Sequence, residues 1–211
     1  MTDDLASLRE TARSYFDEET SPAHDWQHVR RVETLAERLL GESPEADERV
    51  LRAAVLLHDI GRPREDRGEI DDHAAWGAET ARDILPEHGF ANPDPVCHAI
   101  RAHRYSTAPE PERIEAKLLC DADNLDALGA VGIARCFSYG GERGDSLHDP
   151  DLPPEADETT AGATQFNHFH KKILSLPDRM YTDAGRAIAD ERCEYVEGFL
   201  DRFEREVAGE R

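Results

Sequence analysis

The sequence predicts an all-helical (all-α) protein, and three observations lead to this prediction. Apolar residues recur every three or four positions along most of the chain, the spacing that places side chains on one face of a helix. No segment alternates apolar and polar residues in the manner of a half-buried strand. Glycine and proline, which end helices, interrupt the pattern at intervals. We therefore expect a bundle of helices without a sheet.

The N-terminal region contains the first two predicted helices. An apolar stripe of leucine, alanine and aromatic residues predicts a helix over 3–19, which Ser21 and Pro22 interrupt. Valine and leucine at three- and four-residue intervals predict a second helix over 25–40, and Gly41 ends it.

A third helix is expected to be central. Ser43 and Pro44, followed by acidic residues, are typical of the cap and first turn of a helix. The apolar run 53–57 is nearly continuous, which indicates burial on all sides. The helix is expected to stop near Gly61, and the polar residues 62–72 to form a loop.

The remaining pattern predicts five more helices and one long loop. Residues 139–160, rich in glycine, aspartate and proline, are the longest expected loop. One domain over 1–211 is expected, with a core at about 20–140 and C-terminal helices at about 165–207 that pack on it. The five helices are expected at 72–85, 95–103, 114–137, 165–176 and 183–207.

The chain is strongly acidic, with a formal net charge of −21 from 46 Asp and Glu against 25 Lys and Arg. Such a charge repels nucleic acids and anionic membranes, so neither is an expected partner. The acidic residues are scattered, which favours halophilic adaptation over an acidic interaction surface. We expect a cytoplasmic protein, because no apolar run has the length of a membrane span and no leader peptide is recognised.

The sharpest chemical feature is the doublet His58-Asp59. Five apolar residues lead directly into it, and an ionisable pair at the end of a buried helix is costly unless it is paired or binds a metal. Neighbouring residues on a helix point about 100° apart, so both reach one ion only near the helix end. A buried hydrogen-bonded pair is the alternative.

Two further residues complete a candidate ligand set. His28 borders the apolar stripe of the helix over 25–40, which places it to face the same interior as His58. Asp123 lies in CDADNLDALGA, near the start of an apolar helical stretch, where an N-cap is the alternative role. Two histidines and two carboxylates suit a divalent ion such as Mn, Mg, Co, Ni, Fe or Zn.

The order of these residues, with their flanks, resembles the HD-domain superfamily of metal-dependent phosphohydrolases. The matching stretches are HDWQHVRRV (24–32), AAVLLHDIGR (53–62) and CDADNLDALGAVGIAR (120–135). FSYGGERG and TQFNHFHKKILSLPDRM are similar to a subgroup of small, stand-alone HD hydrolases. The resemblance covers about residues 20–205 and implies an HD-domain helical bundle.

The resemblance also implies a role for each candidate ligand. His28 corresponds to the first metal-binding histidine and Asp123 to the last ligand. His58 and Asp59 correspond to the doublet, and we expect Asp59 to be catalytic as well. In HD hydrolases the metal binds a phosphate oxygen and lowers the pKa of a bound water, which attacks phosphorus.

His73 and His103 are the next candidates for catalytic residues. His73 follows the acidic turn EIDDH, and His103 stands near a helix end; both match positions where two-metal HD proteins place an extra ligand. Each is expected to ligate a second metal, bind phosphate or donate a proton. The alternative for both is a polar surface residue.

Three basic residues are candidate substrate contacts. Some HD nucleotidases have a catalytic acidic residue three positions after the doublet aspartate, where this chain has Arg62, with Arg64 behind it. Either the general acid comes from elsewhere, or these arginines bind substrate phosphates. Lys171, in a lysine-poor chain, is a further candidate for contact with an anion. A solvated surface position is the alternative for all three.

The expected function is hydrolysis of phosphate esters or anhydrides in a small phosphorylated substrate. Nucleotides are the favoured class, which rests on the resemblance alone, because a fold does not fix a substrate. Stand-alone relatives look like nucleoside triphosphate pyrophosphohydrolases. A non-catalytic regulatory or ligand-binding HD module is the alternative, and the presence of all four expected ligands argues against it.

Overall fold

The computed structural model describes residues 2–104 and 109–210, and its secondary structure within them is helical apart from an isolated bridge between Ser146 and Thr164. The prediction of an all-α fold is confirmed. The chain divides into two compact units, Met1–Asp123 and Asn124–Arg211, which are described separately below. No helix in the described part of the chain combines the length and apolar character needed to cross a bilayer.

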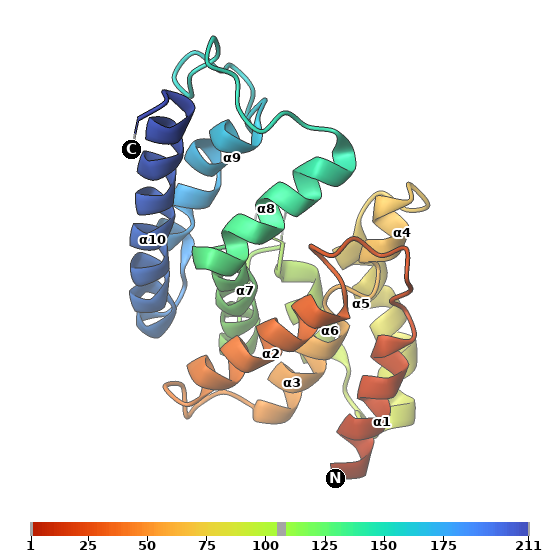
Figure 1. The fold of residues 1–211 in the computed structure, drawn as a ribbon. Helices are drawn as coiled ribbons and strands as arrows, with labels where there is room; N and C mark the ends of the chain where they lie inside the picture. Colours follow the sequence, from red (N-terminus) through yellow and green to blue (C-terminus); the bar gives the residue numbers. More distant parts are fainter. Residues whose placement is uncertain (1, 105–108, 211) are drawn as a thin grey trace. The chain divides into compact units, whose positions relative to one another are not determined.

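The first unit is built from short helices that pack around α3 (Figure 1). Helix α3 contacts α1, α2, α5 and α6, and almost every residue from Leu51 to Ile60 is buried, which confirms the predicted central position of this helix. The helices are α1 (Thr2–Arg13), α2 (Trp26–Leu40), α3 (Glu48–Leu57), α4 (Arg62–Asp66), α5 (His73–Ile84), the 3₁₀ turn η1 (Leu85–His88), α6 (Asp94–Ala102) and α7 (Ile114–Asp126), whose last turn enters the second unit.

Aspartate side chains fix where three of these helices begin. Asp25 accepts a hydrogen bond from the backbone N–H of His28 at the start of α2. Asp47 caps α3 in the same way, and Asp72 caps α5 directly before His73. Such caps satisfy backbone donors that have no partner inside the helix. Two of the three caps therefore set the position of a histidine in the first turn.

Two predicted elements were wrong. Residues 62–72 were expected to form a loop, but α4 occupies 62–66, because Pro63 suits the first turn of a helix. The predicted helix over 114–137 is broken, and α8 (Gly129–Arg143) starts anew where Gly129 adopts a positive φ of 69°. A Cβ at Gly132 would lie 2.1 Å from the carbonyl oxygen of Ala127, so the turn needs glycine there.

Some boundaries differ by several residues. The first helix ends at Arg13 rather than near 19, and α8 runs into the segment expected to be loop. The predicted helix over 165–176 consists of α9 (Gln165–Lys171) and the 3₁₀ turn η2 (Ile173–Ser175), and η3 (Pro177–Arg179) follows. The last helix, α10 (Asp183–Val207), agrees with its predicted range.

The second unit contains a cluster of aromatic rings, of which Phe166 and Phe169 are buried. Helix α10 packs against α8, and α8 contacts α9. Asp157 organises the long loop before α9, because its side chain accepts hydrogen bonds from Thr159, Ala163 and Asn167. The rings of this cluster belong to Phe137, Phe166, Phe169, Phe199 and Phe203.

Candidate metal centre

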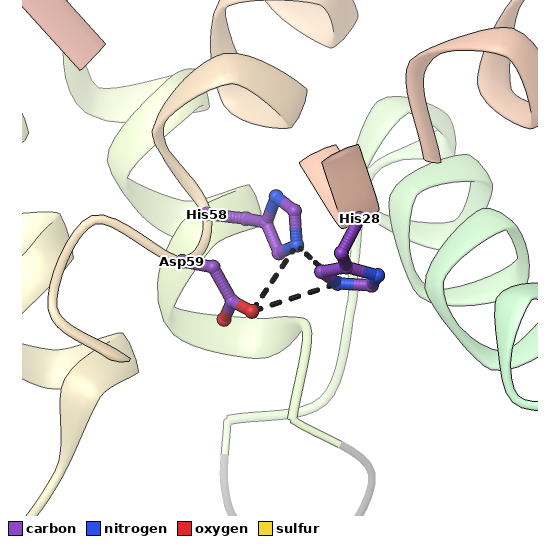
Figure 2. Close-up of side chains that lie close together, drawn as sticks. All are labelled: His28, His58 and Asp59. Carbon is purple, nitrogen blue, oxygen red and sulfur yellow. Dashed lines mark hydrogen bonds and ion pairs between the residues drawn. The ribbon is translucent and has the colours of Figure 1, made fainter. Parts of the chain in front are cut away.

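Three side chains of the first unit meet at a buried point (Figure 2). His28 comes from the first turn of α2, whereas His58 and Asp59 follow the last residue of α3. His28 Nε2 lies 3.4 Å from His58 Nε2 and 3.5 Å from Asp59 Oδ2. The exposed fractions are 0% for both histidines and 4% for Asp59. The structure therefore brings together three of the four predicted ligands away from water.

Asp123 completes the predicted set. Its Oδ1 lies 3.3 Å from His28 Nε2, and its side chain is 27% exposed. Asp123 stands in the last turn of α7, not near the start of a helix, because the break before Gly129 ends that helix earlier than expected. The alternative reading of Asp123 as an N-cap does not fit this position.

A second cluster shares Asp59. Its other carboxylate oxygen, Oδ1, lies 3.3 Å from His73 Nε2 and 3.6 Å from His103 Nε2. The two Nε2 atoms are 3.3 Å apart. His73 begins α5 and His103 follows α6, and both are buried rather than on the surface.

Gly61 lets the turn after α3 approach α5. A Cβ at this position would lie 2.7 Å from the carbonyl oxygen of His73 and 3.1 Å from the ring of Trp76. Only a residue without a side chain permits this contact. Gly61 therefore helps to bring Asp59 next to His73, in addition to ending the turn.

The hydrogen bonds of the rings orient the donors inward. His58 Nδ1 lies 2.8 Å from the carbonyl oxygen of Val55, and His103 Nδ1 lies 2.6 Å from that of Ile100. A carbonyl accepts, so each Nδ1 carries a proton, and in the neutral ring Nε2 has a lone pair. Both lone pairs point into the clusters.

The donor set fits a divalent cation. Lone pairs of Nε2 atoms that face one another and a carboxylate repel unless a proton or a metal cation lies among them. The separations between His58 or His103 Nε2 and the Asp59 oxygens, 3.8 and 3.6 Å, exceed the ~2.7–3.2 Å of ordinary hydrogen bonds. In each triad the candidate ligand atoms lie within 4.8 Å of one another. Nitrogen and carboxylate donors of this kind suit first-row divalent metals.

The electrostatics of the first cluster keep the donors in their ligand forms. Burial lowers the pKa of His58 to about 4, so the ring is neutral near pH 7. Burial alone would raise the pKa of Asp59 and Asp123, but the neighbouring histidines hold both pKa values well below the ordinary value. A neutral imidazole and an ionised carboxylate are the forms that bind metal.

His73 behaves in the opposite way. Burial would lower its pKa, but hydrogen bonds to Asp59 and Glu65 outweigh burial and raise the pKa to about 9. In the metal-free protein His73 is therefore protonated near pH 7, while His58 is not.

These two histidines predict that the metal-free protein is most stable near pH 6.5. Between pH 6.5 and about 4, His58 binds a proton in the unfolded chain but not in the folded protein. The free energy of unfolding therefore falls as the pH decreases. Between pH 6.5 and about 9 folded His73 retains a proton that the unfolded chain has lost, so the free energy falls as the pH rises. Each limb amounts to roughly 3 kcal/mol at most.

Denaturant titrations of chelated protein across this pH range measure the effect. His58→Gln should flatten the acidic limb, and His73→Gln the alkaline limb. If the free energy of unfolding of the wild-type protein showed no maximum near pH 6.5, the pKa shifts assigned to His58 and His73 would be contradicted.

The three basic candidates lie in different surroundings. Arg62 adjoins the second cluster, with Nη1 at 3.4 Å from His73 Nδ1. Arg64 is more exposed; it pairs with Glu69 at 2.8 Å and lies over the ring of Trp76. Lys171 belongs to the second unit, where its Nζ donates to the carbonyl oxygen of Asp157 at 2.7 Å.

Sequence reasoning missed Glu65 and Arg104. Glu65 lies on α4 and contacts His73, Arg62 and Arg104. The available signal was the spacing of three residues between Arg62 and Glu65, which suits an ion pair on a helix. That signal has meaning only once α4 is known to be a helix, and the segment was expected to be a loop.

Comparison with known proteins identifies the family. A sequence model of the HD domain matches residues 25–128. Over 208 residues the chain is 36% identical to a Bacillus subtilis protein described as uncharacterized protein YpgQ, covering 96% of this chain and 93% of YpgQ. A solved structure of an HD-superfamily hydrolase from Bacillus thuringiensis is 33% identical, with a TM-score of 0.75 and 98% of each chain covered. The chain belongs to the HD superfamily of hydrolases.

This HD hydrolase has a further solved relative. The structure of Bacillus subtilis YpgQ in complex with ADP is 31% identical, with a TM-score of 0.74, and covers 97% of this chain and 98% of that one. The expected resemblance is confirmed, as is the prediction of a phosphohydrolase. HD domains bind divalent metals, and the His/Asp clusters of this HD hydrolase are able to hold one. The role of each individual site residue stays a prediction.

Proposed function

We propose that this HD hydrolase cleaves phosphate ester or anhydride bonds of nucleotides. The observation that carries the proposal is the ADP complex of YpgQ, a relative of which this chain covers 98% at 31% identity. A nucleoside diphosphate presents an anhydride and a phosphate ester to the same binding site. The buried clusters around Asp59 provide the place where such a phosphate group would react.

In this proposal both clusters are metal-binding sites. A divalent ion, when bound, neutralises the charge of the reacting phosphate and lowers the pKa of a water molecule. His28, His58 and Asp123 would hold an ion at the first cluster, His73 and His103 would do so at the second, and the Asp59 carboxylate borders both clusters. Burial of these side chains excludes bulk water, which strengthens the electrostatic interactions of the site.

We further propose that Arg62 binds a substrate phosphate. Its side chain is 16% exposed and lies against His73 at the second cluster, in a chain with a net charge of −21. A local cation is needed there to attract an anionic substrate, and the guanidinium is suited to phosphate oxygens. For Arg64 and Lys171 contact with substrate stays a prediction.

A panel of nucleoside mono-, di- and triphosphates, assayed with Mn²⁺, Mg²⁺, Co²⁺ or Ni²⁺ at low and multimolar salt, tests the proposal. We expect metal-dependent release of phosphate or pyrophosphate from at least one nucleotide class. Binding of the ribose and base would hold the anhydride or ester bond at the metal centre.

A non-nucleotide control separates substrate class from chemistry. Inorganic pyrophosphate and an aryl phosphate carry the same bonds without a base or ribose. Turnover of these compounds with none of any nucleotide would overturn the nucleotide proposal. Hydrolysis of a nucleotide at a kcat/KM well above that of both simple compounds supports it.

A further inference from the structure

Glu65 is the centre of a small network beside the second cluster. Its Oε2 lies 2.7 Å from His73 Nδ1 and accepts a hydrogen bond from Arg62 Nη1 at 2.8 Å. Its Oε1 accepts a hydrogen bond from Arg104 Nη1 at 3.1 Å. The Glu65 side chain is 17% exposed, and contact with His73, Arg62 and Arg104 lowers its pKa to about 2 although burial opposes this. Glu65 is thus a fixed, ionised acceptor.

The acceptor at Nδ1 decides which nitrogen of a neutral imidazole carries the proton. For His58 and His103 this acceptor is a backbone carbonyl three residues earlier in the chain. His73 has the side chain of Glu65 instead. The protonation of His73 Nε2, which faces the cluster, therefore depends on the Glu65 side chain, and a single substitution can remove that side chain.

The position of Arg62 increases the dependence of the His73 tautomer on Glu65. Its Nη1 lies 3.4 Å from His73 Nδ1, and a guanidinium group can donate hydrogen bonds but cannot accept them. If the Glu65 carboxylate were absent, a lone pair on Nδ1 and a proton on Nε2 would suit Arg62 better. A proton on Nε2 would face Asp59 Oδ1, 3.3 Å away, and leave no lone pair for the cluster.

We propose that Glu65 is a positioning residue that holds His73 in its Nδ1–H tautomer, so that the Nε2 lone pair faces Asp59 and His103. The inference rests on the proposed role of His73 in the second cluster and extends it to the residue behind the ring. Partners of this kind orient a metal-binding histidine and increase its basicity.

Long-range ¹H–¹⁵N spectra of histidine-labelled, metal-free protein test the tautomer. They are recorded at an alkaline pH at which the ¹⁵N shifts themselves show the His73 ring to be neutral. A His73→Asn variant assigns the resonances. We expect the proton of wild-type His73 on Nδ1, and in Glu65→Gln at least half of the population with the proton on Nε2. Glu65→Asp, which keeps the carboxylate, should restore most of the wild-type signal.

Glu69→Gln is the matched control. It removes a carboxylate from the neighbouring exposed segment, where Glu69 pairs with Arg64 and Arg67 rather than with His73. His73 should keep the wild-type tautomer in this variant, and His58 and His103 should keep theirs in all variants. A wild-type His73 with its proton on Nε2 would overturn the proposal, as would an unchanged tautomer in Glu65→Gln. If Glu65→Gln does not fold, the wild-type and Glu65→Asp spectra still decide.

Titration of Mn²⁺ into metal-free protein gives a second readout. The affinity of the site that loses an ion in His73→Asn should fall about 10- to 100-fold in Glu65→Gln, while the affinity of the other site changes little. Equal Mn²⁺ affinities in Glu65→Gln and wild type would contradict the proposal. Neither measurement uses a nucleotide, so a shifted tautomer in a protein that hydrolyses no nucleotide would overturn the proposed substrate and leave the role of Glu65 intact.

Discussion

Replacement of Asp59 by asparagine is expected to reduce kcat/KM at least about 1000-fold, equivalent to ~4 kcal/mol. The physical reason is that Asp59 serves both clusters, with Oδ2 at 3.5 Å from His28 Nε2 and Oδ1 at 3.3 Å from His73 Nε2. Asparagine keeps the volume but removes the charge and turns one acceptor into a donor that faces a histidine. Steady-state hydrolysis and the metal content of the purified protein measure the loss.

The control for this substitution is again Glu69→Gln, because Glu69 is an exposed acidic residue outside the clusters. Its activity should stay within about twofold of wild type, since surface substitutions of this kind have small effects. Circular dichroism checks that Asp59→Asn is folded. A folded Asp59→Asn variant with wild-type hydrolysis would contradict the assignment of the metal centre.

Removal of the metal is expected to abolish hydrolysis and to lower the thermal stability of the protein. A ligand present at about 1000 times its Kd stabilises the folded state by ~4 kcal/mol. In a chain of this size that corresponds to a decrease in Tm of roughly 8–16 °C on chelation. The first cluster adds to the effect, because without the ion the lone pair of neutral His58 faces the Asp59 carboxylate. Calorimetry or dye-monitored melting with and without chelator measures the difference.

Re-addition of single metals to the chelated protein shows which ion restores both properties. The double variant His28→Gln, His58→Gln is the control, because it lacks two donors of the first cluster and its Tm should respond much less to chelation. Hydrolysis that persists after complete removal of metal, confirmed by elemental analysis, would contradict a metal-dependent mechanism.

The sequence predicted the parts of the molecule that depend on local pattern. The buried helix before His58 was predicted because five apolar residues in succession have few alternatives to a central position. The convergence of His28 with His58 and Asp59 was predicted from the joint motif, since no single histidine has a distinctive neighbourhood. The all-helical class followed from the same spacing of apolar residues.

Other features depend on contacts between distant residues and were beyond the reach of local pattern. The break between α7 and α8 lies within a continuous apolar periodicity, and the close approach of Gly132 to Ala127 explains it. Helix α4 is polar along its length and is recognised only from Pro63 in its first turn. Glu65 was missed with it, and two of its three partners, His73 and Arg104, come from other segments of the chain.

The two clusters share one construction. His28 and His58 are 30 residues apart, and so are His73 and His103. In each pair the first histidine stands in the first turn of one helix, and the second directly follows the next long helix. Because α2 packs on α3 and α5 on α6, each pair closes the open end of a helical hairpin.

This construction determines where the chain tolerates changes in length. The connections 41–47 and 85–93 lie at the opposite ends of the hairpins, about 15 Å of helix away from the histidines. Insertions into the exposed parts of these connections are expected to leave the positions of the ligands unchanged. The segment 59–72 joins the hairpins and carries both Asp59 and Glu65, so even a single inserted residue would shift one pair of histidines against the other. Two of the turns are thus expected to tolerate changes in length, whereas the segment between them is expected to tolerate none.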